Sequence, residues 1–302
     1  MARAWHIENG HLATGEKSGE KDGAPVAVLL RGEEASSRQL SHAQREVLSQ
    51  LEHAAMPFLE RTASGAAGLV VTASGRRRFG FVLSPDELLL VDDGDLCATA
   101  LGHAVEDRQP VEGPAGALCA LLRELLRDHP ARLSRMRDDF ECLEEQLLEG
   151  RERPDRGKMM SDTRRMLGLD TFYQGMSDLA GELAEDETGL VAPLDRARLR
   201  SLARLLGRLS NRLESLQDYS LQVHGLYQES IDLRQNSVMQ WLTVVATIAM
   251  PLTFVTGWYG MNFPHMALFD APWGYAAVIV ACVAIVAAEV AFFWHHGWLR
   301  FK

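Results

Sequence analysis

The apolar residues of this chain are concentrated near its C-terminal end. Residues 238–257 contain no charged side chain, and residues 273–294 contain a single one, Glu289. Each run matches the roughly 20 residues that a helix needs to cross the hydrocarbon core of a membrane. Two buried core helices are the alternative, but uncharged runs of roughly 18 residues or more favour membrane spans. We therefore predict transmembrane helices at 238–257 and 273–294.

The first part of the chain has the short apolar runs of a sheet. These runs, bounded by turn residues, predict strands at residues 26–30, 69–72, 76–83 and 88–91. Residues 1–23 show little periodicity and are expected to be an irregular start. Ser36 and Gln39 have the spacing of a capping box, which predicts a helix that runs to about Glu52. Residues 1–112 are thus predicted to form an α/β domain.

From residue 115 the apolar spacing changes to threes and fours, the period of a helix. Pro130 should break or kink this stretch, and a second helix is predicted at residues 159–185. A longer helix follows, because no proline occurs between Asp195 and Pro251. Its apolar seam has heptad spacing and skips Ser220; the seam comprises Leu199, Leu202, Leu206, Leu209, Leu213, Leu216, Val223 and Tyr227. Residues 113–237 are predicted to be a helical region that includes this stalk helix.

The charges that flank the apolar runs predict the topology. Arg234 precedes the first run, Arg300 and Lys302 follow the second, and residues 262–271 between them contain no lysine or arginine. The positive-inside rule places both termini in the cytoplasm and the connection outside. Tryptophans lie near the run ends, as in an aromatic belt; they are Trp241, Trp258, Trp273, Trp294 and Trp298.

This topology predicts a multi-pass protein of a bacterial inner membrane. Residues 1–112 and 113–237 are then cytoplasmic, residues 258–272 form a periplasmic loop, and residues 295–302 form a cytoplasmic tail. Lipid is an expected partner. The first residues lack an apolar stretch, so no cleaved signal peptide is expected.

Composition narrows the function. The formal net charge is −10, which disfavours nucleic acid as a partner because phosphates attract lysine and arginine. The four cysteines, at positions 97, 119, 142 and 282, have no metal-ligand spacing and are expected to be free thiols. We find no arrangement of catalytic residues or phosphate-binding loop, so an enzyme is not expected.

Small, polar or flexible side chains share one face of the first apolar run. At helical spacing this face carries Asn236, Met239, Thr243, Ala246, Met250, Thr253, Gly257 and Gly260, with Leu242 at its edge. The opposite face is bulky and is expected to suit lipid; it carries Trp241, Val244, Val245, Ile248, Leu252 and Val255. A ring of symmetric copies could line a pore with the small face. A surface for helix packing is the alternative.

The chemistry of this face suits a hydrated cation. A ring of Asn262 side chains at the outer end would offer neutral oxygens, which can bind the water shell of an ion such as Mg²⁺. Pro251 removes a backbone hydrogen bond to the carbonyl of Thr247, and a water-lined cavity would satisfy that carbonyl. Met239, Leu242 and Met250 could form hydrophobic constrictions that gate by dewetting.

At these residues the chain resembles the CorA family of divalent-cation transporters. Three stretches carry the resemblance: Leu233 to Thr243, Met250-Pro251-Leu252-Thr253-Phe254, and Tyr259-Gly260-Met261-Asn262-Phe263. The resemblance implies an α+β cytoplasmic domain, a long stalk helix and two C-terminal transmembrane helices in a homopentameric funnel. The first span would line the pore and the second would pack outside it.

The resemblance also implies roles for individual residues. Gly260, Met261 and Asn262 would form the selectivity filter, with Asn262 contacting the metal. The family's other pore positions fall on Asn236, Met239, Leu242, Met250 and Thr253. Family members move Mg²⁺, often with Co²⁺ or Ni²⁺, so the metal would be cargo and no catalytic cofactor is expected.

Two departures from the family pattern leave the ion open. The loop after the triplet lacks the usual glutamate, since Asp270 is its only carboxylate, and the acidic position expected on the stalk falls near Ser201, among arginines. These departures favour a ZntB-like Zn²⁺ transporter, for which coupling to protons is an open alternative, whereas the intact triplet favours Mg²⁺. A membrane-anchored coiled-coil scaffold is the alternative of another class.

Three further groups have ordinary explanations. Glu289 is expected to snorkel to the interface or to pair with a stalk residue. His295 and His296 could bind a transition metal but are expected to be interfacial. The aspartates at 92, 93 and 95 could bind a divalent ion, but a solvated turn is the preferred interpretation.

Overall fold

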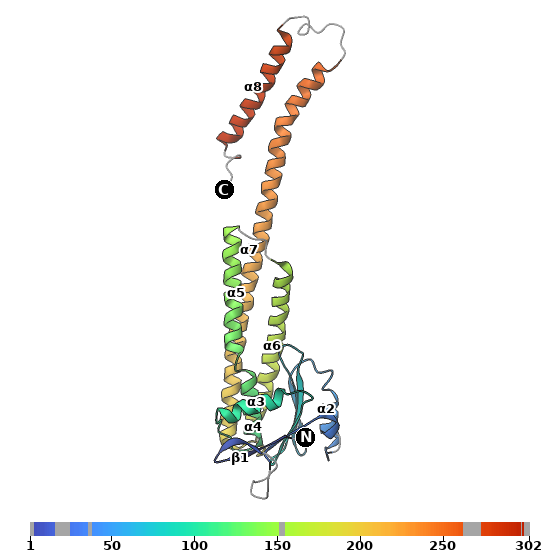
Figure 1. Cartoon of the computed structure of the whole chain (residues 1–302), viewed down its shortest axis with the longest axis vertical. Helices are drawn as coiled ribbons and strands as arrows, with labels where there is room; N and C mark the ends of the chain where they lie inside the picture. Colours follow the sequence, from blue (N-terminus) through green and yellow to red (C-terminus); the bar gives the residue numbers. More distant parts are fainter. Residues whose placement is uncertain are drawn as a thin grey trace. The chain divides into compact units, whose positions relative to one another are not determined.

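The computed structural model describes residues 3–15, 25–35, 38–150, 155–261, 273–296 and 298. The chain divides into two compact units, residues 1–223 and residues 224–302. The first unit holds a sheet, helices α1 to α6 and the first part of α7. The second unit holds the rest of α7 together with α8 (Figure 1).

Among the described residues, seven strands form one mixed sheet in the first unit. Its order is β2-β1-β3-β7-β6-β5-β4, in which β3 and β7 are parallel and all other neighbours are antiparallel. The strands are β1 (Arg3–Glu8), β2 (His11–Gly15), β3 (Ala27–Leu30), β4 (Phe58–Thr62), β5 (Gly65–Val71), β6 (Arg78–Leu83) and β7 (Leu88–Val91).

Helices cover both faces of this sheet. Helix α2 (His42–Ser49) packs on one face, and α3 (Leu96–Glu106) and α4 (Pro114–Leu125) lie on the other (Figure 1). Val47 of α2 shares a buried cluster with Leu69 and Leu89, while the alternate residues Val70 and Leu90 are buried on the opposite side. Strands covered on both faces are apolar almost throughout, which explains the continuous apolar runs of β5 and β7.

The predicted strands are confirmed, with shifted ends. Strand β7 has the predicted bounds of 88–91, β3 begins one residue late, and β5 begins earlier than residue 69. Strand β6 begins at Arg78 because residues 73–76 form the turn before it. Neither β4 nor α3 was predicted, since β4 is short and has no buried residue and α3 lies in a stretch rich in alanine.

Two predictions in the first 52 residues are wrong. The start of the chain is not irregular, because β1 and β2 pair as an antiparallel hairpin through Asn9 and Gly10. The capping box belongs to Ser41 and Gln44 instead of Ser36 and Gln39: the Gln44 amide N donates to Ser41 Oγ, and the Ser41 amide N donates to Gln44 Oε1. The helix therefore begins at His42; Ser36 lies outside the described residues.

The boundaries of the helices agree with the predicted breaks in the helical region. A short helix α1 (Gly32–Ala35) follows β3, and the long helices are α5 (His129–Glu149), α6 (Arg156–Ala184), α7 (Pro193–Tyr259) and α8 (Gly274–His295). Pro130 breaks the helix as predicted and occupies the first turn of α5, where it costs no hydrogen bond. Helix α7 is continuous over 67 residues despite Pro251.

The heptad seam of α7 is buried in the first unit. Every seam leucine from Leu199 to Leu216 is buried, and Val223 is fully buried. Ser220 is also buried, so it occupies the seam position that the apolar pattern skips. Tyr227 is half-buried. A helix of about 100 Å gains its stability from such packing, since long single helices are rarely stable alone.

Two buried carboxylates hold the beginning of α7 in place. Asp195 accepts hydrogen bonds from the backbone N of Gly113 (3.0 Å) and of Glu112 (3.3 Å), so it caps α4 from a distant part of the chain. Gly116 leaves the room for it, since a Cβ there would lie 2.4 Å from Asp195 Oδ1. Asp186 binds Arg61 of β4 and the backbone of the α6–α7 connection.

The second unit presents apolar surface. Helices α7 and α8 are each long and apolar enough to cross a membrane. Only 6% of the most apolar window of either helix is buried, which excludes the interpretation that these are core helices of this single chain. Exposed apolar surface on this scale requires lipid or further protein.

Candidate functional site

The predicted pore face of α7 is exposed along its described length. Met239, Leu242 and Met250 are 58%, 69% and 76% exposed. Asn236, Thr243, Ala246 and Thr253 are exposed as well, and Gly257 and Gly260 continue the same side. At helical spacing these residues fall within about 120° of the helix circumference. The structure therefore brings the predicted residues together on one part of the exposed side of α7, a side that also includes the bulky Trp241, Val245 and Phe254.

The reverse face of α7 is covered by α8. Val244 is 3% exposed, and Ile248, Leu252 and Val255 are half-buried. The facing side of α8 has its own covered residues at spacings of three and four, including Ile285, Val286 and Phe293. The sequence assigned this side of α7 to lipid, and the structure corrects that for the four residues that face α8.

The polar groups of the pore face are tied to their own helix. Thr243 Oγ1 donates to the carbonyl of Met239 (2.9 Å), and Thr253 Oγ1 donates to the carbonyl of Ala249 (2.8 Å). Such bonds satisfy hydroxyls in apolar surroundings without a second helix. Pro251 is half-buried within the helix.

The outer end of α7 closes in a turn. The backbone N of Gly260 donates to the carbonyl of Thr256 (2.9 Å), and that of Met261 to Trp258 (3.4 Å). The two described residues of the predicted filter, Gly260 and Met261, are exposed. Asn262, the predicted metal-contacting residue, lies outside the described residues, as does most of the loop 258–272. Its role stays a prediction.

Glu289 is half-buried on α8. Its Oε2 atom is buried and has no hydrogen-bond partner, and no ion pair joins the side chain to any described residue. The expected pairing with a stalk residue is therefore not found in the described part of the stalk, and snorkelling stays a prediction. Glu289 is the only charged residue of α8. In the sequence it was the one sign of which side of α8 faces α7.

The other metal candidates receive no support in the described residues. No cluster of three or more His, Cys, Asp or Glu side chains with metal-binding geometry occurs in that part of the chain. His296 Nδ1 is 3.0 Å from the carbonyl oxygen of Phe292, and its ring contacts the Phe292 ring. Asp92 is buried instead of solvated, because its carboxylate accepts from the backbone N of Gly94 and of Cys97 at the start of α3.

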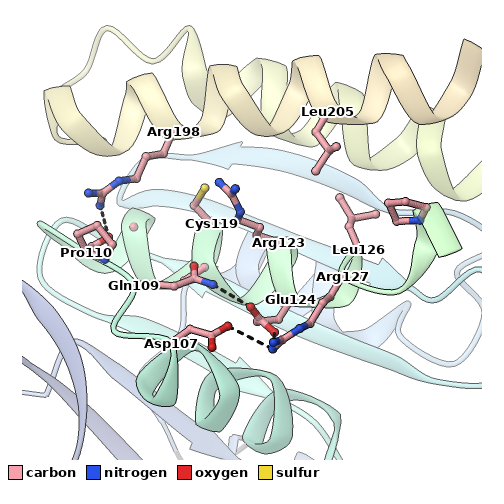
Figure 2. Close-up of a pocket in the computed structure, with 13 residues that line it drawn as sticks. Asp107, Gln109, Pro110, Cys119, Arg123, Glu124, Leu126, Arg127, Arg198 and Leu205 are labelled. Atoms are coloured by element: carbon pink, nitrogen blue, oxygen red, sulfur yellow. Dashed lines mark hydrogen bonds and ion pairs between the residues drawn. The ribbon is translucent and has the colours of Figure 1, made fainter.

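The first unit also contains a pocket of about 540 Å³ beneath the start of α7 (Figure 2). Its charges mostly pair with one another: Arg127 binds Asp107 and Glu124, and Arg198 donates to the carbonyl of Pro110. Burial raises the pKa of the Cys119 thiol to about 12, so this cysteine is unreactive. The two carboxylates that line the pocket, Asp107 and Glu124, are both paired with Arg127, which disfavours binding of a divalent cation there.

Comparison with known proteins identifies the family. The family model described as "CorA-like Mg2+ transporter protein" matches residues 68–296, which is most of the chain. The chain belongs to the CorA family. Members of this family are transporters and not enzymes.

The relatives of this chain include both a cobalt/magnesium transport protein and a zinc transport protein. The cobalt/magnesium transport protein CorA of Thermotoga maritima is 28% identical over 182 residues, 60% of this chain and 52% of that protein. The zinc transport protein ZntB of an Enterobacter species is 24% identical over 222 residues, 71% of this chain and 66% of that protein. The chain thus spans about half the length of the Thermotoga relative.

A solved structure agrees over the whole chain. The complete structure of the CorA magnesium transporter from Methanocaldococcus jannaschii has a TM-score of 0.75 with 19% identity, covering 99% of both chains. The predicted fold class, an α/β part followed by a long helix and apolar C-terminal helices, is confirmed. The homopentameric funnel stays a prediction.

Proposed function

We propose that this CorA-family chain forms a homopentameric, channel-like transporter of divalent metal cations, with Mg²⁺ as the main ion and Co²⁺ and Ni²⁺ as further ions. The observation that carries the proposal is the exposed strip of small, polar or flexible side chains on α7, from Asn236 to Met261, which leads to the predicted filter residue Asn262. A single helix cannot enclose a path, but symmetric copies turn such a face inward and close it into a pore.

Selection at the outer mouth follows from neutral oxygens. Five Asn262 side chains would bind the inner water shell of the ion without a negative charge. Mg²⁺ gives up water reluctantly, so a site that accepts the hydrated ion avoids that cost. The absence of charge also lets the ion leave, which conduction requires.

Further along the face, apolar side chains provide the gate. Met239, Leu242 and Met250 alternate with the small residues Thr243 and Ala246 on the exposed side of α7. Apolar rings exclude water when they are narrow and admit it when they widen. The methionines suit this role because their unbranched chains adapt to either width.

The setting is a bacterial inner membrane. Helices 238–257 and 273–294 would span it, with the loop 258–272 in the periplasm and both termini in the cytoplasm. The flanking charges Arg234, Arg300 and Lys302 support this orientation. Lipid would cover the exposed apolar side chains of α8, such as Val280 and Phe292.

A Zn²⁺ transporter is the second candidate. The match to the zinc transport protein favours it, and so do the exposed arginines around Ser201, namely Arg200 and Arg204. A cluster of cations near that position disfavours a regulatory Mg²⁺ ion there.

A flux panel with purified protein in liposomes separates these candidates. Entry of Mg²⁺, Co²⁺, Ni²⁺ and Zn²⁺ is measured with ion-sensitive dyes, with and without a pH gradient. The proposal expects Mg²⁺ flux that does not need the gradient. Zn²⁺ flux that depends on the gradient would support the second candidate, and no flux of any of the four ions would leave a membrane-anchored scaffold as the better account.

A further inference from the structure

The pocket beneath the start of α7 holds a positive charge that the described residues leave without a partner. Arg123 lines this pocket from α4 and is exposed to solvent (Figure 2). No hydrogen bond or ion pair joins its guanidinium to any described residue. The neighbouring Arg127, in contrast, is paired with both carboxylates of the pocket, Asp107 and Glu124. The charge left over on the pocket wall is therefore that of Arg123, and it attracts anions.

A second guanidinium lines the same pocket from α7. Arg198 Nη1 donates to the carbonyl of Pro110 and to Oδ1 of Asp195 (3.1 Å), so the buried Asp195 carboxylate balances the charge of Arg198. No hydrogen bond joins Nε or Nη2 of Arg198 to the part of the chain that the structure describes. These two nitrogens remain available as donors to a ligand, because a guanidinium carries five N–H groups in one plane.

The two arginines act on one point of the pocket, the Sγ atom of Cys119. Burial raises the pKa of this thiol and so does the charge of Asp195, whereas the charges of Arg123 and Arg198 lower it. Coulomb interactions weaken with distance, so both guanidiniums lie near this sulfur. An anion in the pocket would therefore meet donors from two helices that are far apart in the sequence.

The remaining wall of the pocket is apolar. Leu126, Pro130 and Leu205 line it, and Figure 2 shows Leu126 and Leu205 on the side of Arg123 away from Arg198. The volume of about 540 Å³ lies within the roughly 300–1,000 Å³ of small-molecule sites. Apolar walls with a few convergent charged groups are typical of sites for organic ligands. The lining thus suits a molecule that has an anionic end and an apolar end.

We propose that this pocket binds a small organic phosphate, with its phosphate groups between Arg123 and Arg198 and an apolar ring against Leu126 and Leu205. The planar N–H donors of arginine match the oxygens of a phosphate group. Such a ligand would contact α4 and α7 together and so hold the helices on the sheet against the stalk helix. The inference concerns the first unit alone and does not rest on the proposed function.

Calorimetric titration of the full-length protein in detergent tests the site, with ATP as the probe. ATP carries a triphosphate and an apolar base, and a metal-free buffer keeps transported ions out of the measurement. The test variant is Arg123→Gln, which removes the charge from an exposed side chain. Arg164→Gln is the matched control, because Arg164 is exposed on α6 and its side chain forms no hydrogen bond or ion pair with the described residues.

The expected result is saturable binding of ATP to the wild type and to Arg164→Gln, and binding that is weaker by about tenfold or more in Arg123→Gln. No binding to the wild type overturns the proposal, and so does equal affinity in Arg123→Gln. Tripolyphosphate, which lacks the ring, is expected to bind more weakly than ATP. Equal affinity for the two would show that charge alone is recognised and would overturn the assignment to an organic phosphate.

Discussion

Replacing Asn262 by alanine is expected to reduce Mg²⁺ flux by an order of magnitude or more, while the protein still folds and assembles. The amide oxygen is the group that we propose to hold the water shell of the ion at the outer mouth, and alanine offers no oxygen in its place. Without that ring the ion meets an apolar mouth and has to enter without a binding site. Dye-detected flux in liposomes measures the effect.

A matched control is Thr256→Ala. Thr256 is polar and lies near the same end of α7, but its hydroxyl is used by the carbonyls of Leu252 (3.0 Å) and Thr253 (3.1 Å) of the same helix. We expect nearly unchanged flux in this variant. Equal flux in Asn262→Ala and the wild type would show that the filter lies elsewhere.

Replacing Asp186 by alanine is expected to destabilise the protein by about 3 kcal/mol, because it removes a fully buried carboxylate that serves four donors. Its Oδ1 accepts from Arg61 Nη1 (3.1 Å), from Thr188 Oγ1 (2.7 Å) and from the Thr188 backbone N (3.3 Å), and its Oδ2 accepts from the Val191 backbone N (3.3 Å). These bonds join β4 to the α6–α7 connection. Thermal unfolding of the full-length protein in detergent measures the loss.

The Asp186 carboxylate also makes the stability of the protein depend on pH, and its pKa fixes the direction of that dependence. Burial by itself raises the pKa of Asp186, but the hydrogen bonds from Thr188 and Val191 and the charge of Arg61 outweigh it and leave the pKa below its ordinary value. Its contribution to stability is therefore complete above the ordinary pKa of about 3.9 and is lost as the pH falls through the lowered value.

The Asp186→Ala variant should accordingly lose less stability on acidification than the wild type does. Asp178→Ala serves as the control, since Asp178 is exposed on α6 and its side chain forms no hydrogen bond or ion pair with the described residues. If both variants unfold at the wild-type temperature, Asp186 does not hold the connection as we describe.

The sequence predicted the parts of the fold that have strong periodicity. The leucine seam of α7 and the two apolar runs repeat over many turns, so the helix from Pro193 to Tyr259 and helix α8 were placed to within a few residues. The N-terminal hairpin was missed because β1 and β2 mix charged and apolar residues and are stabilised by pairing with each other and with β3. Pairing between strands leaves little trace in a local pattern.

The candidate site, too, could be predicted only in part from the sequence. Helical spacing was enough to gather Asn236, Met239 and Thr253 on one face, since a regular helix fixes the direction of each side chain. The side covered by α8 could not be predicted, because Val244 and Val245 are equally apolar and only the packing of the second helix tells them apart. The buried carboxylates Asp186 and Asp195 depend on partners far away in the sequence.

The central claim is that the exposed face of α7 lines the path of the cation, and a cysteine scan along this helix tests it most directly. Single cysteines replace Met239, Ala246, Met250 or Thr253 on that face, and Val244, Ile248, Leu252 or Val255 on the side that α8 covers. The background carries serine at the exposed Cys142 and at Cys282, while Cys97 and Cys119 are buried.

Each variant is treated in liposomes with a charged thiol reagent while Mg²⁺ flux is recorded. The account predicts that the reagent blocks flux at the four positions of the exposed face and has little effect at the four positions that face α8. Block at the α8-facing positions with none on the exposed face would contradict it.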